Sequence, residues 1–323
     1  KYIYINIEST NSNEIRLIDT HNPMNKPLVS INRMENHLYY LEHIEEENFF
    51  VRTNLDAPNF KVTKIKSLHN IDLTNFDTVI SHSNSTFIND ILFITDNLVL
   101  EIRENGLPEI RIYNLKSNKE INIEFDDNAY DVSLAYNNEL DGNSFNYYYS
   151  SLTTPPSVLS YDLETSITQE LWSKDIISFN RNDYIDDRFF IESRDGTQIP
   201  IITIAHKSTN LKEAPILFYG YGSYGINIDA SFRSSLIPLL DRGFIFSIIN
   251  IRGGGEMGKY WYEEGRMLNK LNTFHDFNDG VRAVLSKDIG DSNNVFARGG
   301  SAGGLLMGGI INMEPELYTG ILN

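Results

Sequence analysis

The sequence predicts a partial β-propeller of about four blades, followed by a partial α/β domain built on a mainly parallel sheet. Short runs that alternate apolar and polar residues fill the first half, and apolar strand-like segments separated by amphipathic segments fill the second. A chain of 323 residues has room for two domains of ordinary size. We therefore expect a propeller domain over residues 1–177 and an α/β domain over residues 178–323.

The blades are predicted from strand endings that recur at nearly constant spacing. These endings are IRLIDT, KVTKIK, RIYNLK and LSYDLE, which place Asp19, Lys64, Asn114 and Asp162 at comparable positions. Units of about 40–50 residues with several short strands are typical of propeller blades, because one blade cannot bury both faces without neighbours. A β-sandwich with coincidental spacing is the alternative. The sequence starts inside a strand-like run without Met, so we expect an incomplete ring and a missing N-terminus.

The second half contains four apolar segments that are expected to form strands. Runs such as FIFSII are apolar throughout, which is typical of parallel strands covered on both faces. The expected strands are IPIITIAH, APILFYG, GFIFSIINI and NVFARGG. Between them we expect one helix over SFRSSLIPLLDRG, ending at Gly243, and a second beginning at Asn272 or Thr273.

Composition excludes several classes of protein. The hydrophobic fraction of 41% and the aromatic fraction of 12% indicate an ordered globular chain. With 27 Lys and Arg against 44 Asp and Glu and no basic stripe, nucleic acid is not expected as a partner. No apolar run approaches the roughly 20 residues needed to cross a bilayer, so no membrane partner is expected. The lack of cysteine excludes disulfides and thiolate metal sites and suits a cytoplasmic protein.

The strongest local signal is the run NVFARGGSAGGLLMGGIINM, in which Gly299, Ser301 and Gly303 form G-x-S-x-G. The motif lies between an expected strand and an expected helix, as in the nucleophile elbow of α/β hydrolases. Its glycines allow a sharp turn that leaves the serine hydroxyl exposed in front of a helix N-terminus. A glycine-rich turn that merely packs a helix on the sheet is the alternative.

Two further glycine-rich segments follow neighbouring expected strands. YGYGSYG, residues 219–225, lies where an α/β hydrolase places its oxyanion loop, and INIRGGGEMGKYWYEEG follows the next strand. Together with ARGGSAGGLLMG, these segments resemble the catalytic core of the prolyl oligopeptidase family, with variants most similar to oligopeptidase B. The likeness runs from about Ser193 to Asn323, and the preceding blades resemble the second part of that family's propeller.

The resemblance implies a serine peptidase that cuts short peptides after Arg or Lys through an acyl-enzyme, without metal or cofactor. It implies that Ser301 is the nucleophile and that Tyr221 donates to the oxyanion beside the backbone N–H of Ala302. With 18 tyrosines in the chain, an aromatic packing role for Tyr221 is the alternative. The resemblance places Tyr224 in the primary substrate pocket, with core packing as the alternative.

Three more residues have implied roles in substrate binding or site organisation. Asp229 resembles one of two acids that bind a second basic side chain, whereas the partner position holds Ser231, which weakens the expected dibasic preference. Asp229 as an N-cap of the following helix is the alternative. Arg252 is implied to organise the site, with a structural salt bridge as the alternative and Glu256 as the expected partner.

The triad is expected to be incomplete in this chain. α/β hydrolases place the acid and then the histidine after the serine, yet all seven histidines precede Ser301. His275 lies in an expected helix and His206 on an expected strand, so neither is expected to be the base. We expect an inactive fragment of a larger peptidase. A prolyl-specific member of the family, a noncatalytic scaffold, and an esterase or lipase are the alternatives.

Overall fold

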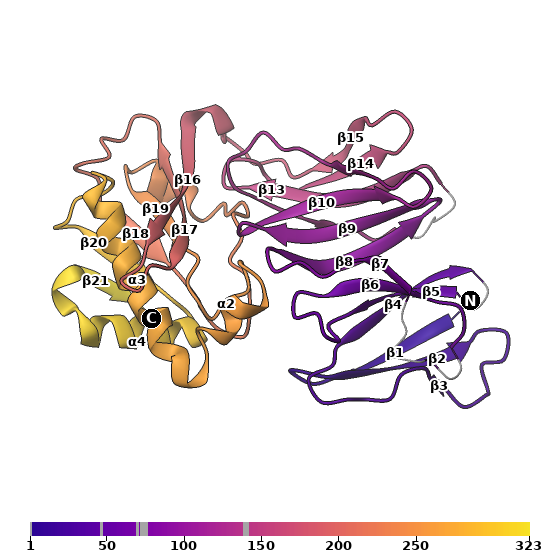
Figure 1. Cartoon of the computed structure of the whole chain (residues 1–323). Coiled ribbons are helices and arrows are strands. Elements are labelled where there is room, and N and C mark those ends of the chain that lie inside the picture. The colour runs from indigo at the N-terminus through magenta and orange to yellow at the C-terminus, as the bar shows by residue number, and fades with distance from the viewer. Residues whose placement is uncertain (1, 46–47, 69–70, 72–76, 138–141) are drawn as a thin grey trace. The chain divides into compact units, whose positions relative to one another are not determined.

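The computed structural model describes residues 2–45, 48–68, 71, 77–137 and 142–323 (Figure 1). The chain folds into two compact units. The first comprises Lys1–Ile102, Arg111–Asn122 and Leu140–Gly142, and the second comprises Arg103–Ile110, Ile123–Glu139 and Asn143–Asn323. The fourth predicted blade thus belongs to the second unit, and the predicted domain boundary between residues 177 and 178 stays a prediction.

The first half of the chain forms four sheets whose strands pair in chain order. The first sheet has three strands and the others have four, and the registers of the first, second and fourth sheets are antiparallel. The strands are β1 (Tyr2–Glu8), β2 (Asn13–Asp19) and β3 (Leu28–Val29); β4 (Tyr39–Glu45), β5 (Asn48–Thr53), β6 (Lys61–Ile65) and β7 (Asp77–Ile80); β8 (Thr86–Ile94), β9 (Asn97–Glu104), β10 (Leu107–Asn114) and β11 (Lys119–Asn122); β12 (Tyr130–Leu134), β13 (Ser144–Ser151), β14 (Ser157–Asp162) and β15 (Thr168–Ser173).

The sequence repeat corresponds to equivalent strands of successive sheets. Lys64, Asn114 and Asp162 lie at or next to the ends of β6, β10 and β14, each the third strand of a four-stranded sheet. Asp19 ends β2 in the same way. The predicted partial β-propeller is confirmed, and the β-sandwich alternative is wrong.

Burial within the first unit explains why a blade needs neighbours on both faces. In β5, Phe49 and Val51 pack into a cluster with residues of β2, whereas Phe50 packs with residues of β8 and β9. Successive residues of a strand point to opposite faces, so β5 is buried on both sides by the sheets before and after it. This burial on both faces agrees with the consecutive apolar residues FFV, which replace a strict alternation.

The second unit contains a six-stranded mixed sheet with the order β16-β17-β19-β18-β20-β21. The pairs β16–β17 and β17–β19 are antiparallel, and the other three pairs are parallel. The strands are β16 (Tyr184–Glu192), β17 (Gln198–His206), β18 (Ile216–Tyr219), β19 (Ile245–Ile249), β20 (Val295–Arg298) and β21 (Gly320–Leu322). Each of the four predicted strand segments overlaps one of these strands, β17 to β20, which confirms a mainly parallel α/β domain.

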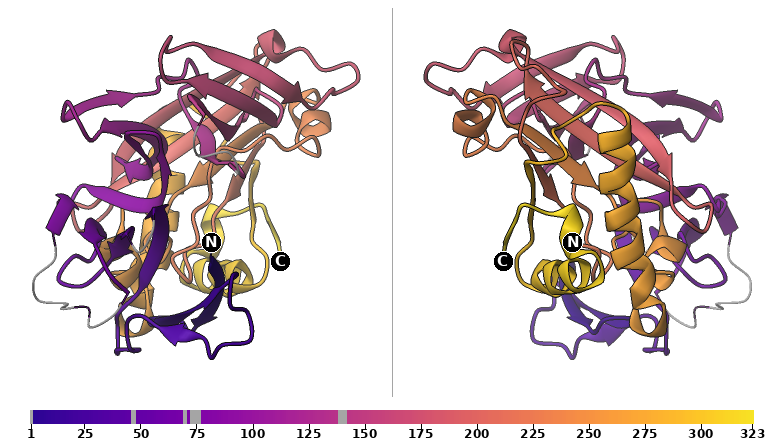
Figure 2. Two further views of the ribbon diagram at one scale, coloured as in Figure 1. Left: turned by 90° about the vertical axis from the view of Figure 1, so that its right-hand side faces the viewer. Right: turned by 90° about the vertical axis from the view of Figure 1, so that its left-hand side faces the viewer.

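Helices α3 (Lys270–Ser286) and α4 (Ala302–Met313) cover one face of this sheet (Figure 2). Ile245 and Ile249 of β19 pack with these helices, whereas Phe246 and Ile248 face a second cluster that includes α1 (Ile237–Leu240). Both faces of β19 are therefore buried, as its apolar sequence predicts. The remaining helical elements are α2 (Lys259–Glu263) and the short 3-10 helices η1 (Arg181–Asp183), η2 (Met267–Asn269) and η3 (Pro315–Leu317).

The first predicted helix is much shorter than expected. Only Ile237–Leu240 is α-helical, because polar groups before it bind elsewhere: Ser231 Oγ donates to Asp131 and the Phe232 N–H donates to Ser150. Pro238 lies in the first turn, where proline is tolerated, and favours a late start. The second predicted helix exists but begins at Lys270, before the predicted start.

Candidate active site

Three glycine-rich loops leave the same edge of the six-stranded sheet. Strands β19, β18 and β20 are parallel, and Tyr219 at the end of β18 pairs with Ile248 on one side and Arg298 on the other. Because the carboxyl ends of parallel strands lie together, the loops carrying Tyr221, Arg252 and Ser301 emerge side by side. The sheet therefore brings together the three segments that the sequence singles out.

Ser301 occupies a sharp turn between β20 and α4. Its backbone has φ 55° and ψ −121°, a strained conformation for a residue with a side chain. A Cβ on Gly299 would lie 2.3 Å from the carbonyl oxygen of Gly303, so only glycine fits at the first position of the turn. The Ser301 side chain is exposed to solvent. The elbow geometry predicted from the sequence is present.

Two groups with oxyanion-donor chemistry lie beside the elbow. Among the described residues, no acceptor binds the backbone N–H of Ala302, the first residue of α4. A Cβ on Gly303 would lie 3.6 Å from Cδ2 of Tyr221 and 3.3 Å from the Gly220 carbonyl oxygen, so the Tyr221 ring packs against the first turn of α4. Tyr221, in the loop after β18, and the Ala302 N–H, at the start of α4, thus lie beside Ser301.

Arg252 is bound to two aspartates rather than to Glu256. Its Nε and Nη2 lie 2.8 and 2.6 Å from the Asp276 carboxylate, and Nη1 lies 2.7 Å from Asp195. Burial alone lowers the pKa of Arg252, but Asp276 and then Asp195 outweigh it, and the net shift is upward. The expected Glu256 partner is wrong, and the alternative of a structural salt bridge describes the observed contacts.

Glu256 is buried and holds the loop before Asp229. Its Oε1 accepts from the backbone N–H of Ile228 at 2.9 Å and from Asn250 Nδ2 at 3.2 Å, while Asn250 also donates to the Ile228 carbonyl. Oε2 has no hydrogen-bond partner among the described residues. Burial raises the pKa of Glu256 to about 7. Buried side chains therefore fix both polar groups of the Ile228 backbone.

Asp229 forms a bidentate ion pair with Arg103. Its two carboxylate oxygens lie 2.7 and 2.8 Å from Nη1 and Nη2 of that buried arginine. Because α1 begins only at Ile237, Asp229 does not cap a helix, and the capping alternative is wrong. Ser231 donates at 2.6 Å to Asp131, whose pKa is raised by burial. The Asp131 carboxyl group thus lies next to Ser231 in the folded chain, although the sequence has no acidic residue at position 231.

Tyr224 is 71% exposed and has φ 60°. This exposure excludes core packing, and its place in a substrate pocket stays a prediction. It lies in the same loop as Tyr221 and contributes its aromatic surface to solvent on the edge where Ser301 emerges.

No described residue that could act as a general base forms a hydrogen bond with the Ser301 hydroxyl. His206 ends β17 and bonds Ser208, His275 lies within α3, and His37 bonds Thr53 in the first unit. His69 lies outside the described residues. The described site therefore brings Ser301, Tyr221 and Ala302 together without a general base, and their roles as nucleophile and oxyanion donors stay a prediction.

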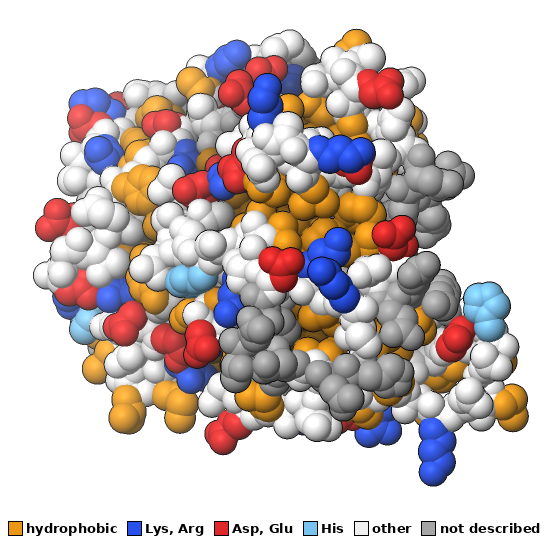
Figure 3. Space-filling model, turned by 45° about the vertical axis from the view of Figure 1, so that its right-hand side comes forward, with side chains coloured by type: hydrophobic (Ala, Val, Ile, Leu, Met, Phe, Trp, Pro, Cys, Tyr) orange, Lys and Arg blue, Asp and Glu red, His pale blue; other side chains and the backbone are white. Residues whose placement is uncertain are grey.

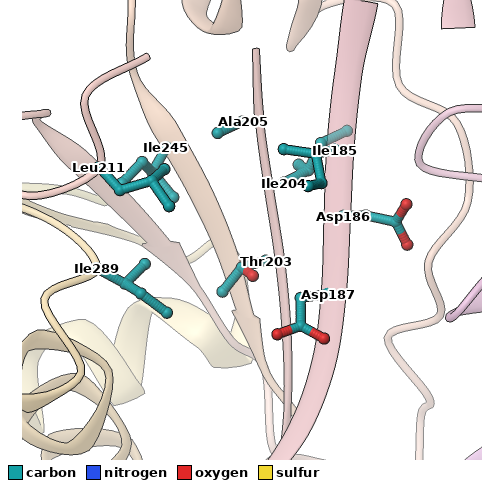
Figure 4. Close-up of a pocket in the computed structure, with 9 residues that line it drawn as sticks. All are labelled: Ile185, Asp186, Asp187, Thr203, Ile204, Ala205, Leu211, Ile245 and Ile289. Atoms are coloured by element: carbon teal, nitrogen blue, oxygen red, sulfur yellow. The ribbon is translucent and has the colours of Figure 1, made fainter. Parts of the chain in front are cut away.

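An apolar pocket of about 320 Å³ lies elsewhere in the second unit (Figure 4). Its lining includes Leu211, Ile245 and Ile289, which precede or begin strands β18, β19 and β20. These residues belong to the amino ends of the parallel strands, opposite the edge from which Ser301 emerges. The pocket is thus separate from the candidate active site.

Sequence reasoning missed several partners of the site residues. Arg103 and Asp131 come from strands of the propeller half, and Asp195 comes from the turn between β16 and β17. Lys270 contacts the loop after Tyr221. A charged residue within a strand rich in apolar residues, such as Arg103 in NLVLEIRE, is the sequence signal that can suggest such pairs.

Comparison with known families agrees with this geometry. The family described as "Prolyl oligopeptidase, N-terminal beta-propeller domain" matches residues 1–174, and "Prolyl oligopeptidase family" matches residues 230–323. The chain belongs to the prolyl oligopeptidase family. It is 32% identical over its whole length to dipeptidyl aminopeptidase BI of Pseudoxanthomonas mexicana and 31% identical to protease 2 of Moraxella lacunata.

Solved structures of this family superpose closely on the chain. Oligopeptidase B from Leishmania major gives a TM-score of 0.90 with 28% identity over 99% of this chain and 46% of its own. Oligopeptidase B from Trypanosoma brucei, solved with covalently bound antipain, gives 0.90 with 30% identity over 99% of this chain and 47% of its own. The chain covers 44% and 46% of the two curated relatives and so spans less than half of their length.

Proposed function

We propose that the full-length protein containing this chain is a serine peptidase that hydrolyses short peptides through an acyl-enzyme. The observation that carries the proposal is the strained Ser301 elbow, flanked by the free N–H of Ala302 and the ring of Tyr221. This combination of nucleophile and oxyanion donors fits acyl transfer. The named peptidases among its relatives support the same reaction class.

In the proposed reaction, Ser301 Oγ attacks the scissile carbonyl carbon while its proton passes to a general base. The Tyr221 hydroxyl and the Ala302 N–H donate to the oxygen as it becomes negative. Collapse of the tetrahedral intermediate breaks the C–N bond, and the leaving amine takes the proton. Water then hydrolyses the ester, releasing the acid product and restoring the serine. None of these steps requires a metal or an organic cofactor.

We further propose cleavage after Arg or Lys, on the likeness to oligopeptidase B. Asp229 is the candidate for a second basic side chain, but its ion pair with Arg103 uses both carboxylate oxygens. A substrate cation must therefore share the Asp229 carboxylate with Arg103 or displace Arg103 from it. This competition favours only a modest preference for dibasic substrates. Asp131 lies beside Ser231 and adds a carboxylate to the same region.

A second candidate activity is the release of dipeptides from a free N-terminus. The relative at 32% identity bears the name dipeptidyl aminopeptidase BI, which supports this alternative. The prolyl endopeptidase-like relatives, such as the human protein at 26% identity, support a prolyl preference less strongly.

The expected partners are short peptides. None of the helices formed by the described residues combines the length and apolar character that crossing a bilayer requires. On the face shown in Figure 3, Lys and Arg side chains are interspersed with Asp and Glu side chains. The net charge of −17 gives no support for nucleic-acid binding. A cytoplasmic location stays a prediction.

The experiment is a comparison of peptides with the full-length protein. Four substrates separate the candidates: an N-terminally blocked peptide with Arg before the scissile bond, the same peptide with Pro, an unblocked dipeptide amide, and a dibasic peptide. We expect the blocked Arg peptide to give the highest kcat/KM and Ser301→Ala to abolish turnover. Turnover that persists in Ser301→Ala contradicts the proposed mechanism, and preference for the unblocked substrate or for Pro selects an alternative specificity.

A further inference from the structure

Lys270, the first residue of α3, reaches the loop that carries Tyr221. Its Nζ donates to the Gly222 carbonyl oxygen at 2.5 Å and to Ser223 Oγ at 2.9 Å. These two acceptors belong to the residues directly after Tyr221. The Lys270 ammonium group therefore binds the Gly222 backbone and the Ser223 side chain, directly after Tyr221 in the chain.

The stability of α3 does not explain a lysine at this position. A cation at a helix N-terminus opposes the helix macrodipole, so a lysine in the first turn is unfavourable. Burial lowers the pKa of Lys270 to about 8, because the ammonium group loses hydration. No described carboxylate forms an ion pair with it. Among the described residues, the hydrogen bonds to Gly222 and Ser223 are the polar contacts that Lys270 forms at this position.

Close packing also restricts the loop that Lys270 contacts. A Cβ on Gly222, which has φ 62°, would lie 2.5 Å from Thr273 Cγ2. A Cβ on Gly253 would lie 2.1 Å from the Gly222 carbonyl oxygen. The loop is therefore in close contact with α3 and with the segment after Arg252, which limits its movement toward both. Lys270 in turn limits movement of the Gly222 carbonyl.

We propose that Lys270 is a positioning residue that fixes Gly222 and Ser223 and thereby holds the Tyr221 hydroxyl where the oxyanion develops. The inference rests on the proposed peptidase function. Lys270 contacts no reacting atom and acts through Tyr221. A displacement of about 1 Å in such a group can lower a rate by about 100-fold. Loss of Lys270 therefore lowers kcat more than it changes KM.

The test is a double-mutant cycle in the full-length protein with the blocked Arg peptide. We expect Lys270→Met to lower kcat about 10- to 100-fold with KM changed less than about threefold. In a Tyr221→Phe background, Lys270→Met should lower kcat by less than about threefold further, because both changes remove the same donor. Lys270→Arg, which keeps the charge and the donors, should retain more activity than Lys270→Met.

Lys287→Met is the matched control, because Lys287 directly follows the other end of α3. This substitution should leave kcat unchanged. Thermal unfolding of every variant checks the fold, and if Lys270→Met does not fold, Ser223→Ala removes one of the two bonds and should lower kcat at least about threefold. Full additivity with Tyr221→Phe, or an unchanged kcat in Lys270→Met, overturns the inference. A wild-type protein without Ser301-dependent turnover instead refutes the proposed function.

Discussion

Replacing Glu256 by glutamine should stabilise the protein above about pH 7 and leave its stability unchanged near pH 4. Burial raises the pKa of Glu256 from 4.5 to about 7, so the folded chain binds this proton more tightly than the unfolded chain does. Stability therefore falls as pH rises from about 4.5 to 7, and the full loss is present above pH 7. Glutamine stays neutral and can still accept from Ile228, so it avoids this loss.

The size of the effect follows from the shift in pKa. Each unit corresponds to about 1.4 kcal/mol, so a rise from 4.5 to about 7 corresponds to roughly 3 kcal/mol at pH 8. Below about pH 4.5 the glutamate is protonated in both states, and the two proteins should have equal stability. Between these limits, the difference should grow steadily with pH.

Urea unfolding at pH 4, 5, 6, 7 and 8 measures this difference. Trp261 is fully buried in the second unit and Trp172 is half exposed, so a Trp172→Phe background makes Trp261 fluorescence the reporter. Glu316→Gln, at an exposed position of η3, is the control and should change the free energy of unfolding by less than about 0.5 kcal/mol at every pH. A Glu256→Gln variant that is equally or less stable than wild type at pH 8 refutes the reasoning.

Four other outcomes are expected. The 323-residue chain alone should not turn over an Arg-containing fluorogenic peptide, because no described base binds Ser301; turnover that Ser301→Ala abolishes contradicts this. In the full-length protein, Tyr221→Phe should lower kcat by about 10²–10³ with little change in KM, and an unchanged kcat identifies a packing residue. Asp276→Asn should destabilise the chain by about 3–5 kcal/mol in urea unfolding, because the buried Arg252 loses its fully buried partner; a loss below about 1 kcal/mol contradicts this. Asp229→Asn should reduce the ratio of kcat/KM for dibasic over monobasic peptides by at most about tenfold, and an unchanged ratio assigns Asp229 to Arg103 alone.

The repeat and the elbow could be predicted because both depend on local sequence. Strand endings such as those at Lys64 and Asn114 mark the same strand of successive blades. The glycines around Ser301 are required by atoms only a few residues away, since Gly299 meets Gly303. Motifs of this kind carry their own geometry, so the sequence alone predicts the fold class and the turn.

The partners of charged residues could not be predicted in the same way. Arg103 and Asp229 are 126 residues apart, and no local pattern connects them. Glu256 is close to Arg252 in sequence, yet Arg252 turns toward Asp276 on α3. Proximity in sequence is a poor guide where three loops meet at a sheet edge, because the folded backbone decides which carboxylates face a buried guanidinium.

The shortened first helix has a related explanation. Residues 231–236 have a helix-compatible sequence, but Ser231 and the Phe232 N–H bind distant groups in the fourth blade. These long-range bonds hold the start of this segment in a non-helical conformation. Lys270 was missed because the predicted helix begins at Asn272 or Thr273, after this residue, and lysines are ordinarily solvent-exposed.

Covalent labelling of the full-length protein tests most directly whether Ser301 is the nucleophile. The protein is treated with a fluorophosphonate, digested and analysed by mass spectrometry, with Ser301→Ala treated in parallel. We predict one adduct per chain on the peptide containing Ser301, loss of peptidase activity in proportion to labelling, and no adduct in Ser301→Ala. An adduct on another residue, or full peptidase activity in the absence of Ser301, contradicts the assignment.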